Sequence, residues 1–140
     1  MNWKDCYSDI CAEIRIMGIH EMELRKRVEL AHKAMFTGEL PSSGSYCHLP
    51  LDKGIEQYNA AVTELDAIQA EVDRLNGVKS QMEQQMSQFT GLAHVIEYKR
   101  LVEGKTYGEL SSELGYSENY LRQFMHRKRN KMITQSTNVS

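Results

Sequence analysis

The sequence predicts an all-α protein, with a long, coiled-coil-like helical hairpin followed by a domain of three short helices. Three observations lead to this prediction. Apolar residues recur at helical spacing over two long segments. Capping residues and glycines divide the rest into short helices, and the only two prolines lie between the long segments. We therefore expect a helical region over residues 1–90, a three-helix domain over residues 91–133 and a flexible polar tail over residues 134–140.

The first long helix is expected over residues 2–36, because two mainly apolar series repeat there every seven residues. The series are Trp3, Ile10, Met17, Leu24 and Ala31, and Tyr7, Ile14, Glu21, Val28 and Met35. Only Glu21 breaks the apolar pattern, which is typical of a coiled coil. Gly18 weakens the helix by about 1 kcal/mol relative to alanine. Gly38 marks its expected end.

A loop is expected over residues 37–53, where Gly, Ser and both prolines collect. A second long helix is expected over residues 55–89, with apolar residues mostly three and four apart. Asn76-Gly77 is a turn-like pair inside it, but one long helix is the preferred interpretation. The two apolar stripes can pair within one chain as a hairpin or between two chains. Both remain open, and the sequence favours a homodimer formed through helices 2–36 and 55–89.

The stretch "GKTYGELSSELGYSENYLRQF", residues 104–124, is typical of two short helices around a tight turn. Thr106 is a good N-cap, and Glu109 stands three residues later, as in a capping box. Gly115 suits a helix end with positive φ, and Ser117 caps the next helix. With only Gly115-Tyr116 between them, the helices must cross sharply, as in a DNA-binding helix-turn-helix. The three short helices are expected over residues 92–103, 106–114 and 117–132.

The last of these helices has a basic side and an apolar side. Residues 119–132 contain five Lys or Arg and no acid, whereas residues 1–91 contain 9 basic and 14 acidic residues. This asymmetry is expected where one end of a protein meets a polyanion, although a solvated helix C-terminus also favours cations. The expected core stripe consists of Leu121, Phe124, Met125, Lys128 with its stem packed, and Met132.

The polar side of the same helix carries the residue types that read DNA. Asn and Gln bond adenine edges, Arg bonds guanine, and Lys, Arg and helix N-termini bind phosphates. Tyr120 is expected at the rim, where it can stack or bond a phosphate. The residues predicted to contact DNA are Lys105, Thr106, Ser117, Asn119, Tyr120, Arg122, Gln123, His126, Arg127, Arg129, Asn130 and Lys131.

Other function classes find little support in the sequence. It contains no phosphate-binding loop, no G-x-S-x-G and no H-E-x-x-H, and the histidines and three cysteines lack ligand spacing. We therefore expect no enzyme, no catalytic residue, no metal and no cofactor. No apolar run approaches the roughly 18 residues of a membrane span, and no signal peptide is evident, so a cytoplasmic protein is expected.

The segment "EYKRLVEGKTYGELSSELGYSENYLRQFMHRKRNKM", residues 97–132, resembles the C-terminal, promoter-reading domain of sigma factors, known as region 4. The matching positions are Glu103 to Tyr107, Glu109 to Ser111, Leu114 to Ser117 and Leu121 to Gln123. Lys128 departs from the family, which usually has alanine there. No sigma region that binds the polymerase clamp or melts the promoter is visible, so a complete sigma factor is not expected.

The order of helices over most of the chain also resembles the ArpU/RinA-like late-gene transcription activators of phages of Gram-positive bacteria. This resemblance implies a phage or prophage protein that binds double-stranded DNA and acts on late operons through host RNA polymerase. It also implies a place at the bacterial nucleoid. The alternative hypothesis is a phage inhibitor or adaptor that binds a protein partner through its long helices.

Overall fold

The computed structural model describes the backbone of residues 2–37, 39–40, 47–48 and 51–137, and the side chains of residues 2–36 and 51–135. The elements are α1 (Trp3–Thr37), β1 (Glu39–Leu40), β2 (Cys47–His48), α2 (Leu51–Met86), α3 (Leu92–Leu101), α4 (Tyr107–Leu114) and α5 (Glu118–Thr137). The predicted all-α class is confirmed. The chain divides into two compact units, Met1–Ser80 and Gln81–Ser140. The domain boundary expected at residue 90 remains a prediction.

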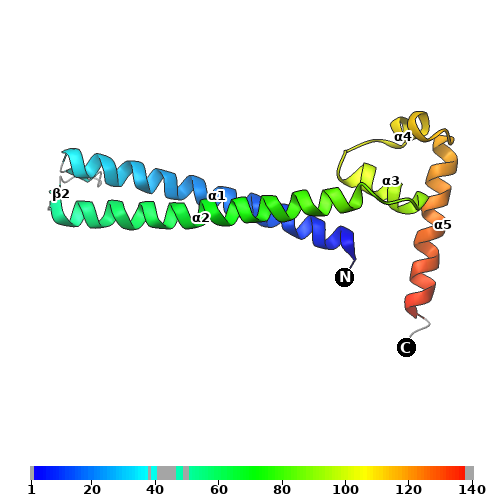
Figure 1. Ribbon diagram of the computed structural model, residues 1–140, viewed down its shortest axis with the longest axis horizontal. Coiled ribbons are helices and arrows are strands. Elements are labelled where there is room, and N and C mark those ends of the chain that lie inside the picture. The colour runs from blue at the N-terminus through cyan, green and yellow to red at the C-terminus, as the bar shows by residue number, and fades with distance from the viewer. Residues whose placement is uncertain (1, 38, 41–46, 49–50, 138–140) are drawn as a thin grey trace. The chain divides into compact units, whose positions relative to one another are not determined.

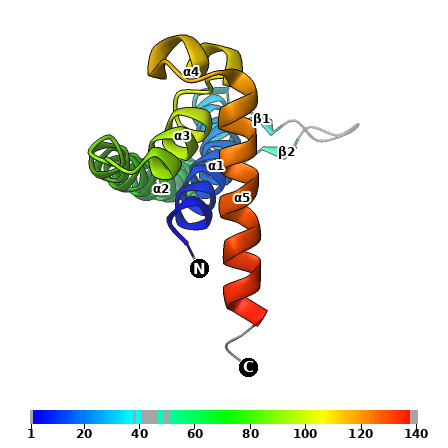
Figure 2. The same ribbon diagram turned by 90° about the vertical axis from the view of Figure 1, so that its right-hand side faces the viewer.

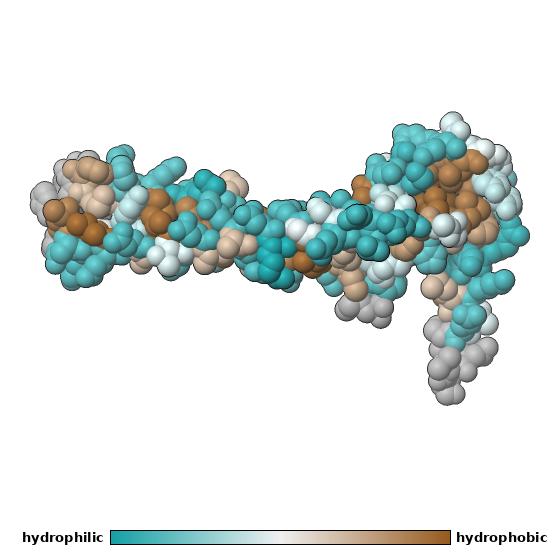
Figure 3. Space-filling view, viewed as in Figure 1, coloured by the Kyte–Doolittle hydropathy of each residue, from teal (hydrophilic) through white to brown (hydrophobic). Residues whose placement is uncertain are grey.

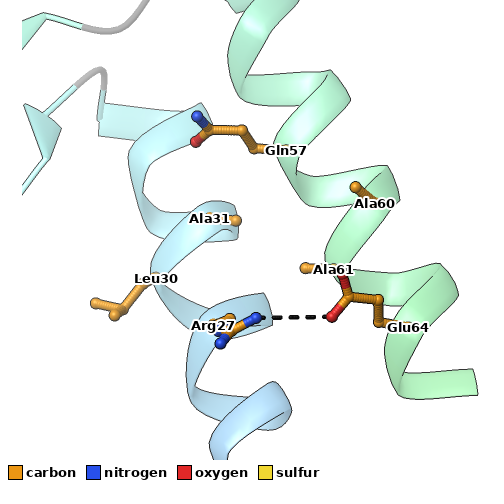
Figure 4. A pocket seen from close by; sticks show the side chains of 7 residues that line it. All are labelled: Arg27, Leu30, Ala31, Gln57, Ala60, Ala61 and Glu64. Atoms are coloured by element: carbon orange, nitrogen blue, oxygen red, sulfur yellow. Dashed lines mark ion pairs between the residues drawn. The ribbon is translucent and has the colours of Figure 1, made fainter. Parts of the chain in front are cut away.

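The first unit is a helical hairpin in which α1 and α2 run antiparallel, side by side (Figure 1). Arg27 Nη1 of α1 lies 3.6 Å from Glu64 Oε2 of α2, and the two side chains face each other in Figure 4. The rings of His32 and Tyr58 are 5.8 Å apart. The long helices therefore pair within one chain as a hairpin, which is the first of the two arrangements that the sequence left open.

The buried side chains of α1 come from the heptad series and from Ala34, which lies outside both series. Tyr7 and Leu24 belong to the two series and are buried, as is Leu75 of α2. Glu21, the polar exception, also contacts the second helix: its Oε1 accepts hydrogen bonds from Arg25 Nη2 (2.8 Å) and Gln69 Nε2 (3.5 Å). The bond from Arg25, with that from Gln69, lowers the pKa of Glu21 despite some desolvation. The carboxylate of Glu21 thus has hydrogen-bond partners within the contact between α1 and α2, which we call the hairpin seam.

The segment between the long helices is more regular than the predicted loop. In the described part of it, β1 and β2 form a two-stranded antiparallel ladder, in which Glu39 pairs with His48 and Leu40 with Cys47. The loop expected over residues 37–53 is therefore wrong at these positions, because strand pairing is not visible in residue types that also suit turns. Gly38, residues 41–46 and residues 49–50 lie outside the described residues.

The bounds of α2 differ from those predicted, although its continuity is confirmed. It begins at Leu51 rather than at residue 55, with Asp52 in the first turn, where an acid favours the helix dipole. It ends at Met86 rather than at residue 89. The helix passes through Asn76-Gly77 unbroken, since glycine lowers helix stability without preventing the helical conformation.

The second unit contains the three-helix core. Ile96, Leu110, Leu121 and Met125 are buried together. Partly buried side chains pack around them: Leu92, Ala93, Tyr107, Leu114 and Phe124. Figure 3 shows apolar residues gathered where α4 and α5 meet, and mostly hydrophilic residues further along α5.

The prediction that the core stripe of α5 continues to Met132 is wrong. Met132 is 66% exposed and Lys128 is also exposed. The helices that pack on α5 are short, with 8 residues in α4 and 10 in α3, so they cover only its first turns. The apolar stripe therefore extends further in the sequence than the surface available to bury it.

The ends of the short helices also differ from the prediction. α3 ends at Leu101 rather than at residue 103, and α5 continues to Thr137. Residues 134–137, expected in a flexible tail, are helical. The segment contains no Gly or Pro to stop the helix, and Thr134 Oγ1 donates to the Asn130 carbonyl oxygen (2.9 Å). Residues 138–140 lie outside the described residues.

Candidate nucleic-acid interface

Both predicted N-caps, Thr106 and Ser117, make capping hydrogen bonds at the starts of the helices that flank the turn. Thr106 has extended backbone angles, and its Oγ1 accepts a hydrogen bond from the Glu109 amide (3.2 Å). Ser117 Oγ accepts one from the Tyr120 amide (3.2 Å). Each cap satisfies an amide that the first helical turn leaves without a partner. The hydroxyl half of the predicted capping box is confirmed, and the start of α5 is fixed in the same way.

The turn between α4 and α5 depends on Gly115. Its φ of 79° and ψ of 12° are left-handed, and its amide donates to the Ser111 carbonyl oxygen (3.1 Å). A Cβ at this position would meet nothing within 4 Å, so the backbone conformation rather than space calls for glycine. Ser111 Oγ donates to the Tyr116 carbonyl oxygen (2.6 Å) and ties the end of α4 to the turn. The predicted glycine stop is confirmed.

Within the second unit, α4 lies across the N-terminal end of α5, and the rest of α5 extends beyond it (Figures 1 and 2). The helices are joined by three residues, Gly115 to Ser117. The arrangement is that of a helix-turn-helix, in which the second helix presents its exposed side to a partner. The side chains on that exposed side therefore decide what the unit can bind.

The exposed side of α5 brings several predicted DNA contacts together. Arg122, Gln123, His126 and Arg127 line one open hollow on its surface. Arg127 Nε donates to the Gln123 carbonyl oxygen (3.5 Å), and Asn130 Nδ2 lies 3.3 Å from His126 Nε2. These two contacts are local, each between residues four positions apart on α5. Asn119, Arg129 and Lys131 are also exposed on α5.

Arg122 is held from two sides. Its Nη2 donates to Glu118 Oε1 (2.5 Å), one helical turn earlier. Its guanidinium carbon lies 5.1 Å from the centre of the Tyr107 ring, within the range of a cation–π contact. The Arg100 guanidinium carbon lies 4.3 Å from the same ring centre, and Arg100 Nη1 donates to the Tyr107 hydroxyl (3.2 Å).

Arg100 and Tyr107 are absent from the set of site residues predicted from the sequence. Their link to Arg122 joins residues of α3, α4 and α5, and no local spacing indicates it. The local sequence "GKTYG" places Tyr107 two residues after Lys105, but it does not indicate either arginine as a partner of the ring. The structure thus adds a second arginine to the positive surface beside the start of α5.

Tyr120 belongs to a row of aromatic rings. It stacks on Tyr116 with ring centres 5.2 Å apart, and Phe124 follows at 6.3 Å. Tyr116 and Tyr120 are both exposed. The row extends from the partly buried Phe124 to the turn, so Tyr120 is positioned by stacking while its outer edge remains accessible.

Lys105 is engaged within the protein. Its Nζ lies 2.5 Å from Glu113 Oε2 and 3.0 Å from Glu103 Oε2, while Lys99 Nζ of α3 lies 2.6 Å from Glu113 Oε1 of α4. The hydrogen bond to Glu113, then that to Glu103, raises the pKa of Lys105. The bonds from Lys105 and Lys99 lower the pKa of Glu113. A phosphate at Lys105 must compete with two carboxylates, and this contact remains a prediction.

In the part of the chain that the structure describes, no group of three or more His, Cys, Asp or Glu is placed to hold a metal ion. Cys6 and Cys11 are free thiols. No helix among the described residues is long and apolar enough to cross a membrane. Comparison with protein-family models, with curated proteins and with solved structures gives no match to the chain.

Proposed function

We propose that this protein is a sequence-specific DNA-binding transcription regulator, with α5 as its recognition helix. The observation that carries the proposal is the exposed hollow of Arg122, Gln123, His126 and Arg127 on a helix held by a three-residue turn. Residues 119–132 carry five positive charges and no negative charge. Such a surface attracts the phosphate backbone, while Arg and Gln also match base edges in the major groove.

The dimensions and placement of α5 support this role. A helix of 20 residues is about 30 Å long, and a major groove about 12 Å wide admits a helix. In a helix-turn-helix the N-terminal residues of the recognition helix meet the base edges. Arg122 and Gln123 occupy that part of α5, so they are assigned to bases. Arg129 and Lys131, further along, are assigned to phosphates.

The wider role follows from the resemblance to sigma region 4 and to ArpU/RinA-like activators. We propose a phage or prophage regulator that activates late genes together with host RNA polymerase and works at the bacterial nucleoid. No catalytic, metal or cofactor role is assigned to any residue. This part of the proposal rests on sequence resemblance, whereas the DNA-binding part rests also on the geometry of α4 and α5.

A protein-binding role through the long helices is the second candidate. The observation that favours it is a group of large apolar side chains exposed on α1, which include Ile16, Ile19 and Met22. An inhibitor or adaptor would use such a surface against a protein partner. It would not need the basic side of α5, so the two candidates make opposite predictions for α5 variants.

A salt-dependent titration tests the proposal. The full chain is titrated into a labelled duplex at several salt concentrations, and the apparent affinity is followed by fluorescence anisotropy. Affinity should fall linearly with salt on a double-logarithmic plot, and Lys131→Ala should reduce the slope by about one. Lys53→Ala, which removes an exposed lysine from α2, is the matched control and should leave the slope unchanged. No binding, or salt-independent binding, contradicts the proposal.

A further inference from the structure

α1 carries a second apolar stripe besides the one that packs on α2. Five large apolar side chains of α1 are exposed, and the first three of them are each more than 60% exposed. They are Ile16, Ile19, Met22, Leu30 and Phe36. Ile16, Ile19 and Met22 stand one helical turn apart and form one strip, and Leu30 follows on the same side beyond the Glu23–Lys26 ion pair. Phe36 lies on another side of α1, beside His32 (ring centres 4.5 Å apart), so we call Ile16, Ile19, Met22 and Leu30 the outer stripe.

The outer stripe lies on the side of α1 opposite the hairpin seam. Ile19 stands two residues from both Met17 and Glu21, the neighbouring seam positions, so it points roughly 160° away from each. Figure 4 shows the same relationship further along: Ala31 points toward α2, whereas Leu30 points away from it. Because α2 covers the seam, it cannot also cover the outer stripe.

The charges of α1 are divided between its two ends. Asp5, Asp9 and Glu13 make the N-terminal third mainly acidic, with Lys4 the only cation before Arg15. The C-terminal third is mainly basic, with Arg25, Lys26, Arg27 and Lys33 against Glu29. A helix with this polarity is complementary to a second copy of itself in the antiparallel direction. In the parallel direction every charge would meet its own kind.

We propose that two copies of this chain associate through the outer stripe, with the two α1 helices antiparallel and Ile19 at the two-fold axis. In this register Ile16 faces Met22 of the second copy. Arg15 then faces Glu23, and Asp5 faces Lys33. This register also brings together one like-charged pair, Asp9 with Glu29. The pairs Arg15–Glu23 and Asp5–Lys33 are both attractive. A two-fold interface of this kind is self-complementary by construction.

The length of α1 makes the contact large. An antiparallel overlap of residues 2–36 is roughly 50 Å long. The inference concerns α1 alone and does not depend on DNA binding by α5, so either proposal can fail without the other.

The oligomeric state tests the proposal first. Sedimentation equilibrium of the full chain should give a dimer, and Ile19→Glu should give a monomer with unchanged helical circular dichroism. Ile133→Glu makes the same chemical change at an exposed isoleucine of α5 and should leave the dimer intact. A monomeric parent chain, or a dimer that Ile19→Glu does not weaken, overturns the proposal.

Disulfide trapping tests the direction of the helices. In a background without the three native cysteines, Ile16→Cys and Met22→Cys chains with different tags are mixed and oxidised. Antiparallel association gives mainly the mixed cross-link, and each variant alone cross-links poorly. Efficient cross-linking of each variant with itself indicates parallel helices and overturns the proposed register.

A charge exchange tests the register independently. Arg15→Glu and Glu23→Arg should each weaken the dimer several-fold, and the double variant should restore it, because both charges of the pair are reversed. If the double variant instead loses as much dimer affinity as the two single variants together, Arg15 and Glu23 do not face each other.

Discussion

The Ser111 hydroxyl donates a 2.6 Å hydrogen bond to the carbonyl oxygen of Tyr116, so the last turn of α4 is tied to the connection that leads into α5. The Gly115 amide bonds the Ser111 carbonyl oxygen in the same place. A single small residue thus holds both sides of the turn. The direction in which α5 leaves α4 depends on this pair of bonds, and so does the position of the basic side chains beyond it.

Ser111→Ala should therefore lower the free energy of unfolding by about 1 kcal/mol, the usual contribution of one such hydrogen bond. Urea denaturation followed by circular dichroism measures it. Ser112→Ala is the matched control, because Ser112 Oγ makes only a 3.4 Å contact with the Gly108 carbonyl oxygen of its own helix. If both variants lose the same stability, the hydroxyl of Ser111 has no special role in the turn.

Gly115→Ala should destabilise the protein by about 1–2 kcal/mol, because an L side chain at a φ of 79° is strained even in open space. Gly108→Ala provides the opposite control. Gly108 is helical, and an added Cβ there meets its nearest atoms at an ordinary 3.8 Å. That change should stabilise by up to about 1 kcal/mol. Thermal unfolding of both variants should show midpoints displaced in opposite directions, and equal displacements would contradict this account.

The Lys99–Glu113–Lys105 network should make stability depend on pH at its acidic end. Because the pKa of Glu113 in the folded protein is lowered from 4.5, its stabilisation is present at neutral pH and is lost as pH falls below that value. Glu113→Gln should therefore unfold more readily than the parent at pH 7, and the difference should shrink at pH 3. Chemical denaturation at the two pH values measures it, and a difference that stays constant rules out the ionic contribution.

The local features of the helix-turn-helix were predictable from the sequence because they depend on residues within four positions of each other. Thr106, Ser117 and Gly115 cap and end helices by local bonds, and the residue types for these bonds are few. The buried positions Leu121 and Met125 also follow from helical spacing. Contacts between residues far apart in the sequence could not be predicted in this way. The ion pair of Lys99 with Glu113 joins residues 14 apart, and neither residue type indicates its partner.

The errors have a physical pattern as well. Met132 continues the apolar spacing of α5 but lies beyond the helices that cover it, so periodicity alone overstated the core. The polar composition of the tail predicts flexibility, although polarity without Gly or Pro does not end a helix. The phosphate contact of Lys105 stays a prediction, because residue type suggests it but does not reveal the two carboxylates that bind its ammonium group.

Variants of α5 should distinguish residues that contact bases from residues that contact phosphates. Arg122→Ala or Gln123→Ala should relax the preference at one base pair by about 1–3 kcal/mol, because a base contact is lost. Lys131→Ala should weaken binding to every duplex alike, because phosphates carry no sequence. Competition titrations with specific and random duplexes measure both effects. Equal losses on both duplexes for all three variants contradict the assignment of Arg122 and Gln123 to bases.

Selection of bound duplexes from a random pool by the chain tests directly whether α5 reads DNA sequence. We expect enrichment of one defined motif, and we expect the Arg122→Ala variant to select the same motif with one position relaxed. Recovery of an unenriched pool, or no retention of duplex at low salt, would contradict the claim that α5 reads DNA.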